Sequence, residues 1–307
     1  MKEFVTVFTP LYNRKDLLMR LYESLTRQTD FSFEWVICDD HSTDGSYELA
    51  KELQLRETGF PIRVDRAPRN GGKHRAVNRG AAMAEGFLFF IVDSDDALMP
   101  NAIERILTWE KTIRQDHRFA GLGFLKGDLS GTMVGTTFDR EFCDCTSLER
   151  EENNISGDKS EVFYTEVIRS HPFPEFEGEN FLTEAVVWDR IAKDGLKLRW
   201  INEVIYLCEY QSGGLTSNWE RLLAANPEGY ALWIRQKMYF VPRTDFERFC
   251  MVYGYYYTLN LSGECSMRYA CEMLGYPLYK AYFYTPIRKA KRLGNRLREY
   301  FSANQHK

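Results

Sequence analysis

The sequence predicts an α/β fold, in which helices flank a mixed, mostly parallel central sheet and a helical extension follows at the C-terminus. Two observations support this prediction. Over the first hundred residues, short apolar runs alternate with stretches of helical periodicity, and turn-forming polar residues follow each run. From about residue 218 onward the pattern is helical and rich in Tyr, Lys and Arg. We therefore predict two domains, residues 1–217 and residues 218–307.

The elements of the first domain are expected in an alternating order. The run FVTVF at residues 4–8 reads as a strand that Thr9-Pro10 ends, and leucines at helical spacing follow from residue 17. The expected strands are residues 4–8, 33–38, 62–64, 87–92 and 199–209, and the expected helices are residues 14–28, 46–55, 73–84, 100–114 and 181–193. Between about residues 121 and 160 the sequence is rich in Gly, Thr, Asp and Glu, which predicts loops and edge strands.

Composition excludes several classes of protein. The 307 residues carry a formal net charge of −4, which argues against a general nucleic-acid surface. The seven cysteines are odd in number and lack the paired spacing of a zinc site, so a reducing compartment is favoured. No run of 18 uncharged apolar residues predicts a transmembrane helix. We expect a cytoplasmic protein.

Polar residues follow three of the predicted strands: Thr9–Asn13, Asp39–Asp40 and Asp93–Asp96. The carboxyl ends of parallel strands form one edge of a sheet, so these groups should converge on one crevice. The aspartates at 93, 95 and 96 offer hard oxygen ligands that suit Mg²⁺ or Mn²⁺. The alternative is a solvated turn whose aspartates cap the next helix.

A glycine pair precedes a basic helix. Gly71-Gly72 comes directly before a predicted helix whose first turns carry Lys73, Arg75 and Arg79. Glycines permit close backbone approach, and a helix N-terminus presents free N–H groups, so a diphosphate is a natural ligand here. A solvated basic helix face is the alternative, since the spacing matches neither a Walker loop nor the dinucleotide fingerprint.

The second strand end could bind a nucleoside. Carboxylates at Asp39-Asp40 can accept hydrogen bonds from a base or from ribose hydroxyls, and Tyr12 could stack on a base. The acidic pair is equally similar to that of a receiver domain, and ordinary packing is the alternative role for Tyr12.

Together these motifs resemble the inverting family 2 glycosyltransferases of the GT-A fold. The matching residues occur in the family's order: Pro10–Asn13, Asp39–Ser46, Asn70–Gly72 with Ala76–Gly80, and Asp93–Asp96. The resemblance implies a metal-dependent enzyme of hexosyltransferase type, which moves one sugar from a nucleotide-sugar, in the first place a UDP-sugar, to a hydroxyl of a glycan or lipid-linked glycan in cell-surface polysaccharide synthesis. It implies that the nucleotide-sugar is bound by Thr9, Pro10, Tyr12, Asn13, Asp39, Asp40, Gly72, Lys73, Arg75, Asn78, Asp93 and Ser94, and that Asp95, Asp93 and Asp96 form a DxD-type site for Mn²⁺ or Mg²⁺.

An inverting transfer also needs a general base for the acceptor hydroxyl. Glu184, four residues before Trp188, best matches the family's acidic residue at a helix start, and Glu179 and Glu177 are rivals. The family's usual Glu-Asp pair is Thr183-Glu184 in this chain. A carboxylate that merely favours the helix N-terminus is the alternative.

The C-terminal region adds a possible partner. Six Lys or Arg residues between positions 288 and 298 follow an aromatic stretch. Many enzymes resembling this family use lipid-linked acceptors, so we expect that residues 282–301 can contact the inner face of a membrane. A solvated helix face is the alternative. Two other functions stay open at this point, a sugar-nucleotidyltransferase and a catalytically inactive nucleotide-sugar-binding module.

Overall fold

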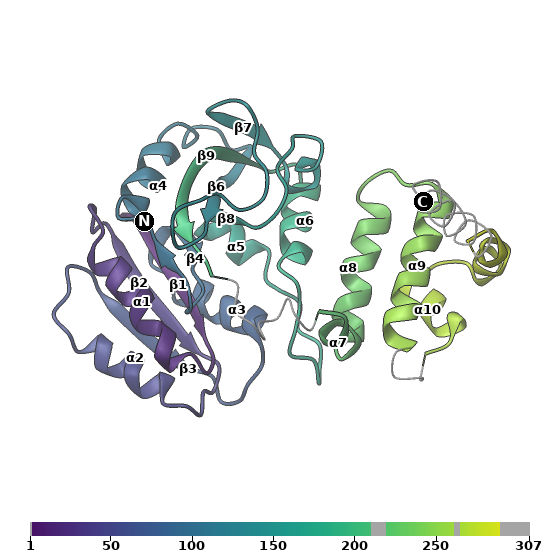
Figure 1. Ribbon diagram of the computed structural model, residues 1–307, viewed down its shortest axis with the longest axis horizontal. Helices are drawn as coiled ribbons and strands as arrows, with labels where there is room; N and C mark the ends of the chain where they lie inside the picture. Colours follow the sequence, from purple (N-terminus) through teal and green to yellow (C-terminus); the bar gives the residue numbers. More distant parts are fainter. Residues whose placement is uncertain (1, 210–218, 261–264, 289–307) are drawn as a thin grey trace, which may run out of the picture. The chain divides into compact units, whose positions relative to one another are not determined.

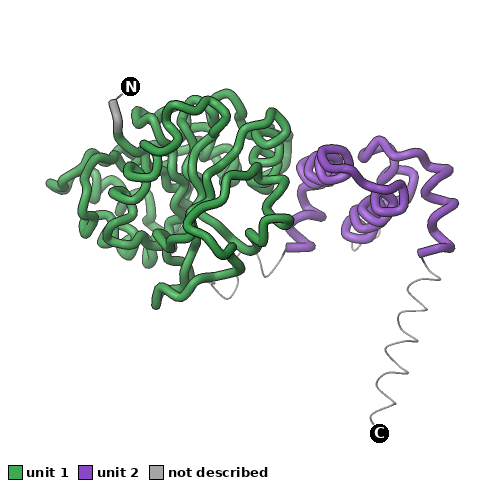
Figure 2. The backbone as a smooth tube through the Cα atoms, turned by 90° about the horizontal axis from the view of Figure 1, so that it is seen from above, with its two compact units in different colours: residues 1–217 green, residues 218–307 purple. Residues whose placement is uncertain are grey.

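The computed structural model describes residues 2–209, 219–260 and 265–288 (Figure 1). The chain divides into two compact units, unit 1 (Met1–Ser217) and unit 2 (Asn218–Lys307), coloured separately in Figure 2. Unit 1 is built around a β-sheet, whereas the described part of unit 2 is helical.

The sheet of unit 1 has the strand order β3-β2-β1-β4-β8-β6-β9-β5, and β7 pairs with β9. The strands are β1 (Lys2–Leu11), β2 (Phe33–Asp39), β3 (Ile62–Arg66), β4 (Gly86–Ile91), β5 (Ala97–Leu98), β6 (Phe119–Gly127), β7 (Phe142–Cys145), β8 (Lys159–Tyr164) and β9 (Lys197–Leu207). Strands β1 to β4 pair in parallel, β8 runs antiparallel to β4 and β6, and β6 is parallel to β9. The predicted mixed, mostly parallel sheet is confirmed.

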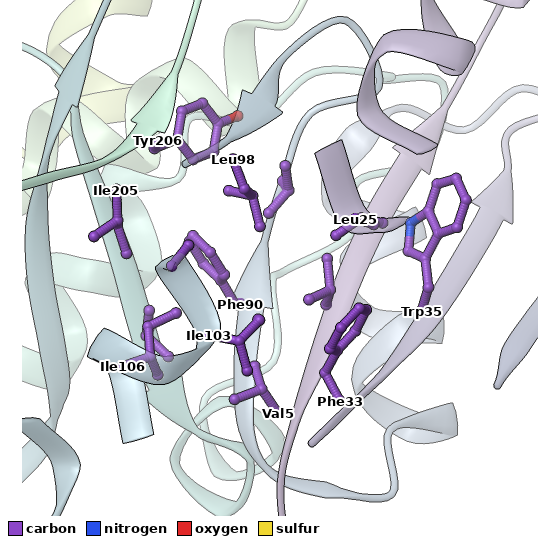
Figure 3. Packing of buried hydrophobic residues seen from close by; sticks show 14 of the residues in the cluster. Val5, Leu25, Phe33, Trp35, Phe90, Leu98, Ile103, Ile106, Ile205 and Tyr206 are labelled. Carbon is purple, nitrogen blue, oxygen red and sulfur yellow. The ribbon is translucent and has the colours of Figure 1, made fainter. Parts of the chain in front are cut away.

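The helices of unit 1 are α1 (Lys15–Thr26), α2 (Ser46–Gln54), α3 (Lys73–Met83), α4 (Ala102–Glu110), α5 (Thr165–Ser170), α6 (Ala185–Lys193) and the 3₁₀ turn η1 (Ser147–Glu149). Leu25 of α1 and Ile106 of α4 belong to one buried cluster with Val5, Trp35 and Phe90 of the sheet (Figure 3). These apolar side chains recur at helical spacing on α1 and α4, so burying them covers one face of the sheet.

Helix α3 packs on the other face. A Cβ atom on Gly80 would lie 2.1 Å from the ring of Phe8, which shows how closely the helix approaches β1. Phe8 stacks on Phe89 of β4 with ring centroids 5.2 Å apart. Successive residues of a strand face opposite sides, so Phe8 and Phe89 form this layer while their neighbours Val7 and Phe90 face the other.

Strand β1 continues three residues past its predicted end at Phe8, so the prediction that Thr9-Pro10 ends the strand is wrong. Pairing with β4 stops at Phe8↔Ile91, whereas pairing with β2 continues through Pro10↔Cys38 to Leu11↔Asp39. At Pro10 the strand pairs with β2 but no longer with β4. Proline has no N–H to donate, so it is tolerated where one side of the strand is unpaired.

Unit 2 contains α7 (Trp219–Ala224), α8 (Pro227–Tyr239), α9 (Asp245–Leu259) and α10 (Met267–Leu274), and residues 278–288 are also helical. Tyr230 of α8 packs against Tyr255 of α9 with ring centroids 5.0 Å apart. Thr244 and Glu247 form a capping box at the start of α9. Among the described residues, none of the helices combines the length and apolar character needed to cross a bilayer.

Candidate active site at the carboxyl ends of the strands

The loops after β1 and β2 are tied together by Asn13. Its backbone N–H donates to Ser42 Oγ at 3.0 Å, and its side-chain oxygen accepts from the Thr43 N–H at 2.9 Å. Asn13 has a φ of 49°, a left-handed conformation that asparagine tolerates better than most residues. Beside it, the Tyr12 side chain is 45% exposed. The ends of β1 and β2 therefore converge as predicted, and the exposed Tyr12 lies next to their junction.

Two predicted binding residues lie in the interior. Thr9 is fully buried, and its hydroxyl accepts a 2.9 Å hydrogen bond from Trp35 Nε1. Asp39 is also fully buried and accepts from the Ser42 N–H at 3.1 Å. Both side chains thus support the strand-end loops in the described structure and do not face an open crevice.

Asp40 connects the end of β2 to the start of α3. Its two carboxylate oxygens accept the backbone N–H groups of Gly71 at 2.8 Å and Gly72 at 2.7 Å. Burial raises the pKa of Asp40, and the two N–H groups act in the opposite direction. The glycine pair is therefore positioned by the carboxylate predicted at the nucleoside.

Gly72 allows a second close contact. Its φ is 91°, and a Cβ at this position would lie 1.7 Å from the carbonyl oxygen of Asn180. Only glycine fits such a conformation and such an approach. The start of α3 is thereby packed directly against the segment that leads to Glu184.

Lys73 joins two of the predicted site carboxylates. Its Nζ lies 2.6 Å from Asp93 Oδ1 and 3.1 Å from Glu184 Oε1. Burial opposes the charge on Lys73, but the two carboxylates outweigh it and hold the pKa of the ammonium above its ordinary value. Burial also opposes ionisation of Asp93, yet Lys73 and then Lys126 keep the pKa of that carboxyl low. The metal and diphosphate side predicted at Asp93 and the acceptor side predicted at Glu184 thus meet at one ammonium group.

The three aspartates after β4 have different partners. Asp93 pairs with Lys73, Asp95 Oδ2 lies 3.3 Å from Arg14 Nε, and Asp96 Oδ2 accepts a 2.6 Å hydrogen bond from the Tyr206 hydroxyl. Asp96 is 6% exposed, and burial together with the Asp93 charge raises its pKa to about 7. Within the described ranges, no three His, Cys, Asp or Glu side chains lie close enough together to hold a metal ion. Through its hydrogen bond with Tyr206, Asp96 stabilises the turn of residues 93–96, and Ser94 in the same turn is also buried.

Two side chains of α3 have other partners than the predicted diphosphate. The Arg75 guanidinium donates to the backbone carbonyls of Phe176 and Glu179. The Asn78 amide donates to the Phe173 carbonyl at 2.9 Å and accepts from the Phe173 N–H at 2.8 Å. Arg75 and Asn78 thus hold the segment 173–179 against α3, because its backbone polar groups need partners.

The three candidates for the general base differ in their surroundings. Glu184 directly precedes α6, its side chain is 37% exposed, and it pairs with Lys73. Glu179 is 7% exposed, whereas Glu177 is exposed on the loop before it. Glu184 is therefore the candidate that is both accessible and linked, through Lys73, to the turn of residues 93–96, here called the aspartate turn.

Two residues of the site were missed from the sequence. Lys126 of β6 places its Nζ 4.2 Å from the ring centroid of Tyr206. Tyr206 of β9 accepts from the Asp93 N–H at 3.0 Å and donates to Asp96, so one hydroxyl fixes both ends of the aspartate turn. Burial opposes the charge of Lys126, but Asp93 keeps its pKa raised. A signal was present, since Lys126 is a lone cation at the end of the apolar run 119–125.

Known proteins have similar sequences. Residues 6–117 match the family model described as glycosyl transferase family 2. The glycosyltransferase GlyG of Streptococcus pneumoniae is 27% identical over 226 residues, which cover 70% of this chain and 73% of GlyG. The uncharacterized glycosyltransferase YibD of Escherichia coli is 36% identical over 104 residues, which cover 34% of this chain and 29% of YibD.

Solved structures agree on the fold. The S. aureus TarS 1-349 structure superposes with a TM-score of 0.60 at 15% identity, over 95% of this chain and 92% of that one. The mannosyltransferase PcManGT from Pyrobaculum calidifontis, in complex with GDP-Man and Mn²⁺, gives a TM-score of 0.54 at 15% identity, over 92% of this chain and 87% of that one. These likenesses establish the GT-A-like fold. The family match and the curated relatives show that residues 6–117 form a glycosyl transferase family 2 domain and that the chain is a glycosyltransferase.

Proposed function

We propose that this glycosyltransferase is metal-dependent and inverting, and that it moves one hexose-type sugar from a UDP-sugar to a hydroxyl of a glycan or lipid-linked glycan in cell-surface polysaccharide synthesis. The observation that carries the proposal is the Lys73 ammonium shared by Asp93 and Glu184. Relatives support the substrate class by their names: one TarS structure contains UDP-GlcNAc, and a Bacillus spizizenii relative is a poly(ribitol-phosphate) beta-glucosyltransferase, 28% identical over 40% of this chain and 19% of that enzyme.

The nucleoside end of the donor is proposed to lie at the joined loops of β1 and β2. Tyr12 offers an exposed ring for stacking on the base. Asn13 and Pro10 shape the loop, and Asp40 fixes the neighbouring glycine pair. Because Thr9 and Asp39 are buried, we assign them to supporting this loop.

The diphosphate is proposed to lie near two lysines. A leaving nucleoside diphosphate gains negative charge as the glycosidic bond breaks, and cations fixed in place beforehand stabilise that charge. Lys73 and Lys126 both interact with Asp93 and so belong to one electrostatic group. Arg75 and Asn78 are instead assigned to holding the segment 173–179.

The carboxylates suit a hard divalent cation. The Asp95 side chain is 22% exposed, and its carboxylate pairs with Arg14 at a long distance of 3.3 Å. Mg²⁺ in nucleotide sites is commonly held by one or two carboxylates, with water and phosphate oxygens completing the shell, so a three-residue cluster is not required. We propose that Asp95, with Asp93, holds Mn²⁺ or Mg²⁺. A cation bound there would offset charge on the departing diphosphate.

Glu184 is proposed as the general base. It would remove the proton of the acceptor hydroxyl while that oxygen attacks the anomeric carbon from the face opposite the diphosphate, which inverts the configuration. Its place at the start of α6 is fixed by the contact between Gly72 and Asn180 and by the ion pair with Lys73. Glu179 is less suited, because it is buried.

The proposal can be tested by a panel of UDP-, GDP-, CMP- and dTDP-sugars, each with and without Mn²⁺. A ligand at about 100 times its Kd stabilises the native state by about 2.7 kcal/mol, so the true donor should raise the melting temperature measurably. We expect a UDP-sugar to raise the melting temperature in the presence of Mn²⁺ and to be hydrolysed slowly, with release of UDP. Release of pyrophosphate from UTP and a sugar 1-phosphate would instead identify a nucleotidyltransferase and contradict the proposal.

A further inference from the structure

Unit 2 presents an exposed aromatic stripe on the helical residues 278–288. Tyr279, Tyr282 and Phe283 are 71%, 63% and 64% exposed, and Ile287 is 36% exposed. Their spacing of three, four and eight residues from Tyr279 places them on one helix face. Large apolar side chains seldom gather on a free surface without a function, so this aromatic stripe points to an interaction site.

The opposite helix face is anchored to α9. Ala281 is fully buried, and the ring of Tyr284 lies 5.7 Å from that of Phe249. Lys280 Nζ pairs with Asp245 Oδ2 at 2.6 Å. These contacts fix the rotation of the helix within unit 2, so the outward direction of the aromatic stripe is set by packing.

The sequence that carries and follows the aromatic stripe is positively charged. Residues 273–298 contain seven Lys or Arg and no Asp or Glu, whereas the whole chain has a formal net charge of −4. Of these cations, Lys280 and Arg288 lie on the described helix, and the guanidinium of Arg288 is 3.9 Å from the ring centroid of Tyr253. Residues 289–301 of the predicted membrane segment lie outside the described residues, so only their sequence enters here.

The combination selects one kind of partner. A second copy of this chain would carry the same positively charged sequence, and like charges disfavour pairing between copies. Tyr and Phe side chains are suited to the interface between lipid headgroups and acyl chains, and Lys and Arg are attracted to acidic lipids. We propose that the aromatic stripe docks unit 2 on an anionic lipid bilayer. This proposal goes beyond the glycosyl-transfer chemistry, since none of its residues belongs to the candidate active site.

The test is sedimentation of the full chain with vesicles of phosphatidylcholine alone or mixed with phosphatidylglycerol. We expect binding to the phosphatidylglycerol vesicles, weakening as salt is added. The double variant Tyr282→Ser/Phe283→Ser should bind them at least about tenfold more weakly, because it removes two exposed apolar groups that would enter the interface. The matched control is Tyr257→Ser, which removes a 55% exposed ring on α9 outside the aromatic stripe and should bind like the wild type.

Three results would overturn the proposal. The wild type could fail to bind the anionic vesicles, or the double variant could bind them as tightly as the wild type. Alternatively, the wild type could form a dimer in solution that the double variant abolishes, which would make the aromatic stripe a contact between copies of the chain. Melting of each variant by circular dichroism shows whether unit 2 stays folded. Donor binding, measured on the same preparations, reports separately on the proposed function.

Discussion

Replacing Gly72 by alanine should disrupt the junction between α3 and the segment that leads to Glu184. The backbone at Gly72, with φ 91° and ψ 159°, is in a region that essentially only glycine occupies. Holding any other residue in that conformation costs about 1–3 kcal/mol of stability. The added Cβ would also lie 1.7 Å from the Asn180 carbonyl oxygen, well inside any real contact. Overpacking of this kind costs about 1–3 kcal/mol. We therefore expect Gly72→Ala to lose about 4 kcal/mol of unfolding free energy, as the sum of the two terms.

The assay is urea unfolding, together with UDP release from the donor identified by the panel. Gly195→Ala is the matched control, because Gly195 also has a positive φ, of 85°, but its Cβ would meet nothing within 4 Å. We expect this control to lose only about 1–2 kcal/mol, the cost of the left-handed backbone alone. We also expect turnover to fall much further in Gly72→Ala, because moving Asn180 displaces Glu184 from Lys73. Equal stability and equal turnover of the two variants would refute this reasoning.

Three further predictions concern single side chains. Burial and the Arg75 charge lower the pKa of His74 to about 4 from an ordinary value of 6.5. The unfolded chain therefore takes up the proton first, and the free energy of unfolding should fall by about 3 kcal/mol as the pH drops from about 6.5 to about 4. His74→Gln should lack this fall, and a pH profile equal to that of the wild type would contradict the prediction. Tyr206→Phe leaves the Asp93 N–H and the buried Asp96 carboxyl without their shared hydroxyl and should cost about 3 kcal/mol in urea unfolding, whereas a loss below about 1 kcal/mol would show that they find other partners. Arg75→Met should release the segment 173–179 and lower turnover while the donor still raises the melting temperature, and a lost donor shift would restore Arg75 to the diphosphate site.

The convergence of the strand ends was predictable because it follows from a general property of parallel sheets. Apolar runs followed by Asp39-Asp40 and by Asp93–Asp96 mark where β2 and β4 end, and adjacent parallel strands end at the same edge. Gly71-Gly72 was also predictable as a point of close backbone approach, because only glycine allows it. In the structure Gly72 approaches the carbonyl oxygen of Asn180.

The partners of the individual side chains were not predictable in the same way. Helical periodicity shows that Arg75 and Asn78 lie on α3, but not that a segment about a hundred residues later would supply their hydrogen-bond partners. Lys126 and Tyr206 come from β6 and β9, which reach the site through the mixed half of the sheet, where strand order does not follow the chain. Burial of Asp96 likewise depends on Tyr206, which is 110 residues away.

The central claim is that the aspartate turn binds a nucleotide-sugar together with a divalent cation, and Asp95 tests it most directly. Binding of the UDP-sugar should be measured by calorimetry, with and without Mn²⁺, in the wild type, in Asp95→Asn and in Asp96→Asn. We predict that Asp95→Asn loses the Mn²⁺-dependent part of the affinity and the release of UDP while it unfolds within about 1 kcal/mol of the wild type, because its side chain is partly exposed and loosely paired. Asp96→Asn should keep the Mn²⁺ dependence, because a neutral amide can still accept from Tyr206. If Asp95→Asn binds and turns over the donor with Mn²⁺ as the wild type does, the metal site proposed for this chain is wrong.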